Sequence, residues 1–193
     1  MLRLPWFEYR APRSVAEATQ ILAGEGPQAM LIAGGTDLLP NMKRRHQTPK
    51  VLVSLRGIDA LKKANGTLGA GLTLTELLQL ENLPVALRQA AAQVATPLLR
   101  NAGTLGGNLC LDTRCSYYNQ NYEWRKAIDF CLKKDGSICW VATASKRCVA
   151  VSSTDTAPAL IALTTVPSRT CGGAFPGAVS GGRVGCPRSG AAR

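Results

Sequence analysis

The stretch Leu31-Ile32-Ala33-Gly34-Gly35-Thr36-Asp37-Leu38 decides how this chain is expected to fold. It continues the apolar run that starts at Ala29, which predicts a short buried strand over residues 29–32. The two glycines permit positive φ angles and let successive backbone N–H groups point into one concavity, which suits a pyrophosphate. The stretch is neither a P-loop nor a G-x-G-x-x-G fingerprint, so a tight strand-to-helix turn without a ligand is the alternative.

The residues around this stretch predict a small α/β lobe over residues 1–57. Ser14 and Glu17 have the spacing of a capping box, so a helix is expected to start there and to end near Ala23, before Gly24. Val51-Leu52-Val53 predicts a further strand. Strands and helices that alternate within about 55 residues are typical of an α/β lobe.

Residues 58–164 predict a second lobe of α+β character, which contains a second glycine-rich stretch, Asn101 to Asn108. Gly106 and Gly107 allow the backbone to approach a flat or charged ligand, and two such stretches in one chain raise the expectation of a bound dinucleotide. The other expected elements are a strand over 67–70, a helix after the capping box of Thr73 and Glu76, a helix from Pro84 to about Ala95, a strand over 149–151 and a helix from about Ala157 to Leu163.

Four of the seven cysteines, Cys115, Cys131, Cys139 and Cys148, lie in a polar stretch. Their spacing contains no C-x₂₋₄-C pair of the kind that zinc sites use, and it does not fit the usual ferredoxin pattern. Scattered free thiols are therefore one interpretation. Against it, the stretch is too polar to order itself by burying apolar side chains, whereas four thiolates bound to one cluster would order it.

Composition and charge limit the function classes. No apolar run approaches the length of a membrane helix, and the N-terminus is too short and mixed for a signal peptide, so a cytoplasmic protein with reduced cysteines is expected. The formal charge is +11, but the Lys and Arg residues are scattered and no nucleic-acid-binding motif is present. A basic face for an acidic protein partner is the favoured interpretation.

Three ordered motifs, Leu31–Leu38, Thr104–Asn108 and Ser153–Pro158, resemble those of a known family, the FAD-binding medium subunits of molybdenum hydroxylases such as xanthine dehydrogenase. The resemblance covers about residues 5–164. It implies an α+β, two-lobed FAD-binding domain of the p-cresol methylhydroxylase type, with lobes over residues 1–57 and 58–164.

The resemblance also implies which residues bind FAD. The first motif would hold the pyrophosphate through its backbone N–H groups, the second would support the flavin and phosphates, and Asp155 would make a polar contact. For Val94 a core position is an equal alternative, and Asp37 and Asp155 have the alternative of capping the helices that follow them. The implied residues are Leu31, Ile32, Ala33, Gly34, Gly35, Thr36, Asp37, Leu38, Val94, Thr104, Leu105, Gly106, Gly107, Asn108 and Asp155.

Residues 110–148 are similar to an insertion in the β subunit of 4-hydroxybenzoyl-CoA reductase, where four cysteines hold a [4Fe–4S] cluster. The matching positions are Cys115, Cys131, Cys139 and Cys148, whereas Cys110 precedes the pattern. The similarity implies an electron-transfer subunit without a catalytic residue of its own. It would relay electrons from ferredoxin through the cluster and FAD to a small [2Fe–2S] subunit and a large molybdenum-cofactor subunit.

Two further expectations concern His46 and the tail. His46 lies in a basic segment and is expected to be exposed and without a role. The stretch from 165 to 193 is rich in Gly, Ser, Pro, Ala and Arg, which predicts disorder. It resembles an out-of-frame reading, so the hypothesis is a frameshifted or truncated product. The alternative functions are then a non-catalytic fragment and a zinc-stabilised binding module.

Overall fold

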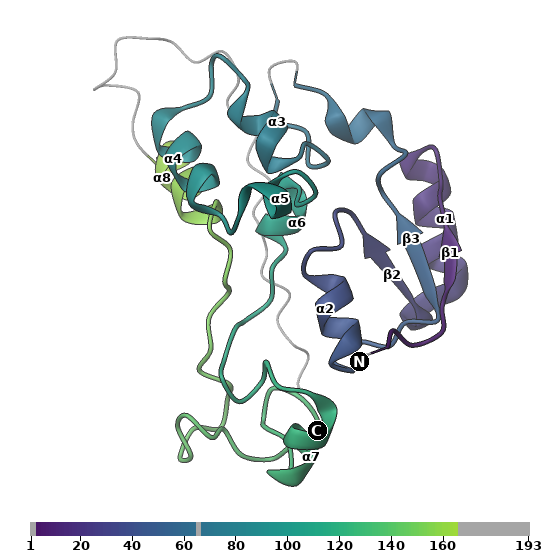
Figure 1. Cartoon of the computed structure of the whole chain (residues 1–193), viewed down its shortest axis with the longest axis vertical. Helices are drawn as coiled ribbons and strands as arrows, with labels where there is room; N and C mark the ends of the chain where they lie inside the picture. The colour runs from purple at the N-terminus through teal and green to yellow at the C-terminus, as the bar shows by residue number, and fades with distance from the viewer. Residues whose placement is uncertain (1–2, 65–66, 166–193) are drawn as a thin grey trace.

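The computed structural model describes residues 3–64 and 67–165, so most of the tail considered above lies outside the described part. The described chain has three regions: a lobe built on a small sheet, a lobe of short helices, and an extended loop that carries helix α7 (Figure 1). Within these ranges, no helix is long and apolar enough to cross a membrane.

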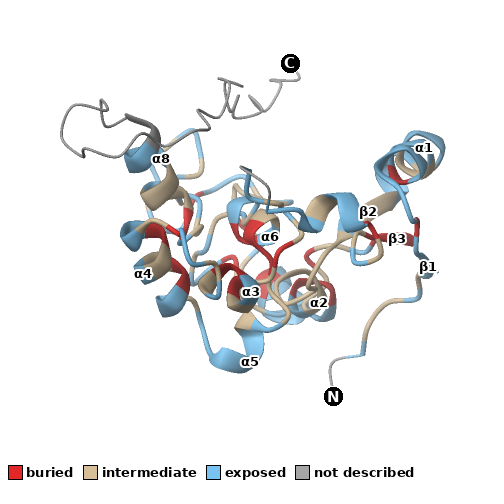
Figure 2. Cartoon of the chain, turned by 90° about the horizontal axis from the view of Figure 1, so that it is seen from above, coloured by how far each residue is buried: buried red, intermediate tan, exposed pale blue. Residues whose placement is uncertain are grey.

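The sheet lobe is built on three parallel strands in the order β1-β3-β2. The central strand, β3, is buried along its whole length because it pairs with a strand on each edge (Figure 2). Ala18 of helix α1 packs on Val51, Val53 and Ile58 to form the small core of this lobe. The elements are β1 (Glu8–Arg10), α1 (Val15–Glu25), the 3₁₀ turn η1 (Gly26–Gln28), β2 (Ala29–Ile32), α2 (Leu38–Lys43), β3 (Val51–Ser54) and the 3₁₀ turn η2 (Asp59–Lys62).

The ends of helix α1 differ in part from the prediction. The hydroxyl of Ser14 accepts a hydrogen bond from the backbone N–H of Glu17 at 3.1 Å, as a capping box requires. The carboxylate of Glu17, however, accepts from the N–H of Arg13 instead of closing the box at Ser14. The helix continues beyond the expected end near Ala23 and stops at Gly26, whose φ of 56° suits glycine.

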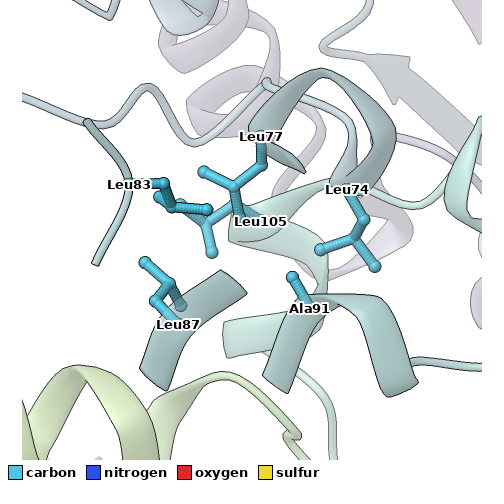
Figure 3. Close-up of a cluster of buried hydrophobic side chains, with 6 residues drawn as sticks. All are labelled: Leu74, Leu77, Leu83, Leu87, Ala91 and Leu105. Carbon is cyan, nitrogen blue, oxygen red and sulfur yellow. The ribbon is translucent and has the colours of Figure 1, made fainter. Parts of the chain in front are cut away.

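The helical lobe encloses a leucine-rich core, in which side chains from α3, α4 and α6 converge (Figure 3). Leu77, Leu87 and Ala91 have no solvent exposure, and Ala159 and Leu160 of α8 pack on the same cluster. The elements are α3 (Leu74–Leu78), α4 (Val85–Gln93), α5 (Pro97–Arg100), α6 (Leu105–Leu109) and α8 (Ala157–Thr165).

The strands predicted over residues 67–70 and 149–151 are not present in the structure. The only ladder contacts near them are single bridges, such as the one between Thr113 and Ser152. A strand needs a partner strand to satisfy its backbone groups, and the described chain supplies no partner at either place. Two predicted helices are present. The capping box of Thr73 and Glu76 is fully formed, and the helix predicted from Pro84 is α4, with Pro84 as its N-cap.

Residues 110–148, named here the cysteine loop, leave the helical lobe after α6 and return to it before α8 (Figure 1). The loop contains α7 (Tyr122–Ala127). The segment just after the loop is fastened to the start of the loop, because the Ser152 hydroxyl donates to the carbonyl of Leu111 at 2.8 Å and the N–H of Ser153 donates to the carbonyl of Asp112 at 3.3 Å. The two strands of chain that connect the cysteine loop to the helical lobe therefore lie side by side.

Candidate cofactor site

The two glycine-rich stretches predicted from the sequence lie against each other. A Cβ atom on Gly34 of the first glycine loop (residues 31–38) would overlap the carbonyl oxygen of Ala102 and lie 2.6 Å from its carbonyl carbon. A Cβ atom on Gly103 would stand 3.5 Å from the hydroxyl of Thr36. The second glycine loop (residues 101–108) therefore meets the first one backbone to backbone, and only glycine fits at Gly34.

The first glycine loop offers unused hydrogen-bond donors. Gly35 has a φ of 73°, the left-handed conformation that turns neighbouring N–H groups toward one side. In the part of the chain that the structure describes, the N–H groups of Gly34, Thr36 and Asp37 donate to no other main-chain group. Leu31 is about half exposed, at 45%. This arrangement of N–H groups is suited to an anion such as a pyrophosphate.

The second glycine loop is held by internal hydrogen bonds. The hydroxyl of Thr104, which is buried, accepts from the N–H of Gly107 at 3.0 Å and caps α6. The N–H of Gly106 donates to the carbonyl of Ala70 at 2.8 Å. Leu105 points into the leucine-rich core. Thr104 and Leu105 are thus buried beneath this loop, whose exposed residues are Asn101 and Gly107.

Asn108 connects the second glycine loop to the Ser153–Pro158 segment. Its side-chain oxygen accepts from the N–H and hydroxyl of Thr156, at 3.0 and 2.7 Å, and from the N–H of Asp155 at 3.2 Å. Its side-chain amide donates to the carboxylate of Asp155 at 2.9 Å. Asn108 and Thr156 are both buried. Two of the three motifs noted in the sequence are therefore one hydrogen-bonded unit.

Asp37 does not cap helix α2 with its side chain. Its carboxylate accepts instead from the side-chain amide of Asn41 at 3.0 Å and from the guanidinium of Arg114. Val94 packs against the leucine-rich core at the end of α4, which agrees with its apolar alternative. No local pattern marked Arg114, because its partner lies 77 residues away along the chain.

The four cysteines marked in the sequence line one pocket. Cys115, Cys131, Cys139 and Cys148 all contribute to it, together with aromatic side chains that include Tyr117, Tyr118 and Trp140, and part of it is open to solvent. Cys131 and Cys139 are buried, and the described cysteines form no disulfide. Cys110 is exposed and lies outside the pocket.

The thiol of Cys139 has a pKa below its ordinary value. Backbone N–H groups of Ala142, Val141 and Val149 donate to its sulfur and favour the thiolate, and they outweigh the opposing effect of burial. Thiolates are the form of cysteine that binds metals. In the described ranges, however, no three His, Cys, Asp or Glu side chains lie close enough to hold a single metal ion.

The backbone around Cys131 adopts uncommon conformations. Asp129, Phe130 and Asp135 have φ angles of 58°, 57° and 67°, in a region that side chains other than glycine seldom adopt. A Cβ on Gly136 would lie 2.6 Å from the backbone nitrogen of Cys131, so this turn also requires a glycine. Such conformations are kept where the surrounding structure holds them in place, and they gather at functional sites.

His46 is not exposed, so the expectation for it was wrong. Its ring is 1% exposed and stacks on Tyr118 of the cysteine loop, with ring centroids 4.5 Å apart. Nε2 lies 3.0 Å from the carbonyl of Gln120. Sequence analysis also missed the buried Arg125, whose guanidinium donates to the carbonyls of Arg44 and Arg45. No local pattern marks these contacts, because the partners are 74 to 81 residues apart.

Comparisons with known proteins show the family of this chain. The profile of a family described as "FAD binding domain in molybdopterin dehydrogenase" matches residues 5–168. The chain is 39% identical over 114 residues to the carbon monoxide dehydrogenase medium chain of Hydrogenophaga pseudoflava, which covers 54% of this chain and 39% of that one.

Two other comparisons extend this result. The chain is 32% identical over 168 residues to the aldehyde oxidoreductase FAD-binding subunit PaoB of Escherichia coli K12, covering 80% of this chain and 52% of that one. The solved structure of quinoline 2-oxidoreductase from Pseudomonas putida 86 matches with a TM-score of 0.51 and 37% identity, over 55% of this chain and 40% of that one. The chain spans about half or less of the length of these relatives.

Proposed function

The chain belongs to the family of FAD-binding domains in molybdopterin dehydrogenases, and from this membership we propose that it is an electron-transfer subunit of a molybdenum-containing oxidoreductase that carries both FAD and a [4Fe–4S] cluster. FAD binding is the property that the family shares. The more specific proposal, a subunit resembling the β subunit of 4-hydroxybenzoyl-CoA reductase, rests on the four cysteines that line one pocket.

FAD supplies the chemistry of exchanging single electrons and storing a pair when it is bound. The protein's part is to hold it. We assign the pyrophosphate to the free N–H groups of Gly34, Thr36 and Asp37, and the adjoining part of the cofactor to the surface of the second glycine loop. Asn108 fixes this second surface through Thr156 and Asp155. Asp155 keeps one carboxylate oxygen outside its bond to Asn108, which leaves it able to make the polar contact expected of it.

We assign the iron–sulfur cluster to Cys115, Cys131, Cys139 and Cys148. Four thiolates are the usual ligands of such a cluster, and each binds a different iron, so the sulfurs stand farther apart than the roughly 3.8 Å that four thiolates around one zinc ion require. The support for this assignment is that all four cysteines line one pocket. The N–H groups that point at the sulfur of Cys139 would stabilise a bound thiolate.

We further propose ferredoxin as the electron donor and the small [2Fe–2S] and large molybdenum-cofactor subunits as the partners that receive the electrons. The support on the donor side is charge. The cysteine loop carries seven Lys or Arg residues against four acidic ones, and Lys126, Lys146 and Arg147 are exposed. A basic face of this kind accelerates docking of an acidic protein.

The test is the metal and flavin content of protein purified without oxygen. We expect bound FAD together with roughly four iron and four sulfide per chain, the content of one [4Fe–4S] cluster. Replacing Cys131 with Ser removes a buried ligand and should abolish most of the bound iron while the flavin stays. Cys110→Ser is the matched control, because Cys110 lies outside the pocket, and its iron content should equal that of the unaltered chain.

Two outcomes would contradict the assignment. Flavin without iron in the unaltered protein would show that the chain binds no cluster and is an FAD-binding subunit only. Equal iron in the Cys131→Ser and Cys110→Ser variants would show that the ligand set is wrong. Zinc in place of iron would favour the binding-module alternative.

A further inference from the structure

The cysteine loop begins and ends at the helical lobe, but its middle part contacts the sheet lobe. Three groups of the loop reach the turn that follows α2: the guanidinium of Arg125, the ammonium of Lys134 and the ring of Tyr118. Lys134 donates to the carbonyl of His46. In Figure 1 the loop lies next to the end of α2, below the sheet lobe. The loop is therefore attached to the helical lobe through the chain and packs, in addition, on the turn after α2 in the sheet lobe.

The stacked pair of His46 and Tyr118 is the centre of this contact. His46 is 1% exposed and Tyr118 is 8% exposed, so both rings are removed from water. The rings are 4.5 Å apart with 30° between their planes. Tyr118 also lines the cysteine pocket. One aromatic ring thus touches both the cysteine pocket and the sheet lobe.

His46 is fixed to helix α2 by a Schellman ending. The N–H of His46 donates to the carbonyl of Asn41 and the N–H of Arg45 donates to that of Met42, both at 3.0 Å. Arg45 takes the left-handed position with a φ of 61°, where glycine is usual. The chain therefore keeps a costly conformation that aims His46 at the cysteine loop.

Arg125 closes the contact from the loop side. It is 2% exposed, and its guanidinium donates to the carbonyls of Arg44 and Arg45 at 3.3 and 3.2 Å. The rings of Tyr122 and Phe130 lie 6.0 and 5.8 Å from the guanidinium carbon. Phe130 directly precedes Cys131, so this buried cation links the turn after α2 to a residue that borders the cysteine pocket.

Helix α2 joins this contact to the first glycine loop. The helix begins beside Asp37, the last polar residue of that loop, and ends at the turn that carries His46. At its beginning, Asp37 is paired with Arg114, the neighbour of Cys115 in the chain. The cysteine loop therefore holds α2 at both ends.

We propose that helix α2 and the turn through His46 form a docking platform that holds the cysteine pocket at a fixed separation from the first glycine loop. His46, Tyr118 and Arg125 are the positioning residues of this platform. Its purpose, electron transfer between two cofactors across a constant distance, rests on the function proposed above. The docking itself does not, because it is made by side chains of this chain alone.

Hydrogen exchange on the full chain with its cofactors tests the docking. His46→Leu and Tyr118→Leu each remove one ring of the stack, and amides of residues 114–136 should then exchange roughly twofold to tenfold faster, the range that the loss of one aromatic pair produces. Tyr118→Phe keeps the ring and should exchange at the rate of the unaltered chain. Tyr9→Leu, which removes an exposed tyrosine of β1, is the matched control and should leave the loop unchanged.

A second measurement separates positioning from general stability. The rate at which electrons pass from cluster to flavin should fall in His46→Leu at unchanged iron and flavin content, because His46 does not line the cysteine pocket, and His46→Phe, which keeps a ring beside Tyr118, should restore it. Equal acceleration of exchange in β3 and in the loop, or no acceleration in the loop, overturns the proposal. If the unaltered protein contains no iron, the proposed function fails, while the exchange experiment still decides whether the platform exists.

Discussion

At the scale of single residues, His46 shows how burial overrides a polar sequence context. It follows Arg44 and Arg45, and a basic run normally faces water. In the fold its pKa is lowered, chiefly by burial, although the bond to the carbonyl of Gln120 acts in the opposite direction. The charged groups that face it, Arg125, Arg44 and Lys134, are all positive and lower the pKa further.

This environment predicts a pH dependence of stability. The unfolded chain takes up a proton on His46 near the ordinary value of 6.5, whereas the folded chain resists it to lower pH. The free energy of unfolding should therefore be highest above about pH 7 and should decrease as the pH falls below 6.5. Urea unfolding at pH 8, 7 and 6 measures this, and His46→Leu should flatten the change.

His46 is the only histidine of the chain, which makes the comparison simple. An identical decrease between pH 7 and 6 in His46→Leu and in the unaltered protein would contradict the prediction, because another group would then be responsible.

At the scale of elements, the two glycine loops act as one site because they touch through their backbones. Each loop is an ordinary strand-to-helix or loop-to-helix turn when taken alone. Gly34 brings them together, since any side chain there would meet the backbone of Ala102 and Gly103. The cradle for FAD is thus a property of the pair of loops.

Gly34→Ala should separate the loops and lower both flavin content and stability. The added methyl group meets backbone atoms that cannot rotate away, so we expect a loss of about 1–3 kcal/mol in the free energy of unfolding, the usual cost of overpacking. Gly24→Ala is the control, because a Cβ at Gly24 in helix α1 meets nothing within 4 Å.

At Gly24 alanine should be neutral or stabilising by up to about 1 kcal/mol, as expected for a helix interior. Flavin absorbance after gel filtration and urea unfolding measure both variants. Full flavin content in Gly34→Ala would show that the contact of the loops is not needed for the site.

At the scale of the whole molecule, the cysteine loop is held both at its ends and along its body. Its ends are closed by Leu111, Asp112, Ser152 and Ser153, and its body is docked on the turn after α2. Next to the closed ends, Asn108 connects α6 to the segment before α8. Because Asn108 lies on the second glycine loop, the same side chain supports both the FAD cradle and the base of the cysteine loop.

Asn108→Ala should therefore destabilise the fold strongly. The substitution leaves the buried N–H and hydroxyl of Thr156 without their acceptor, and each such group costs about 1–3 kcal/mol. We expect a loss of at least about 2 kcal/mol in urea unfolding and a reduced flavin content.

Asn101→Ala is the matched control for this substitution. Asn101 is exposed and accepts one hydrogen bond, from the hydroxyl of Thr75 at 2.7 Å. The free energy of unfolding of Asn101→Ala should remain within about 0.5 kcal/mol of that of the unaltered chain, as is usual for surface changes. Equal effects of the two substitutions would refute the structural role of Asn108.

The sequence alone determined those features that depend on neighbours along the chain. Local patterns predicted a strand over 29–32, a strand over 51–53, the capping box of Thr73 and Glu76 and a helix that starts at Ala157, and all four are present. The strand over 29–32 is only partly buried, and the strand predicted over 51–53 extends to Ser54. Apolar runs, caps and glycines act within a few residues, so they can be interpreted without a fold. The resemblance of three motifs predicted the family, which the comparison confirmed.

Only the tertiary structure decided what lies between distant segments. The strands predicted over 67–70 and 149–151 did not form, since a strand depends on a partner that local sequence cannot supply. Three contacts join residues that are 68 to 77 positions apart in the chain: Gly34 with Ala102, His46 with Gln120, and Asp37 with Arg114. Such contacts follow from how whole elements pack, because burial and close approach are set by the three-dimensional arrangement and leave no periodic mark in the sequence.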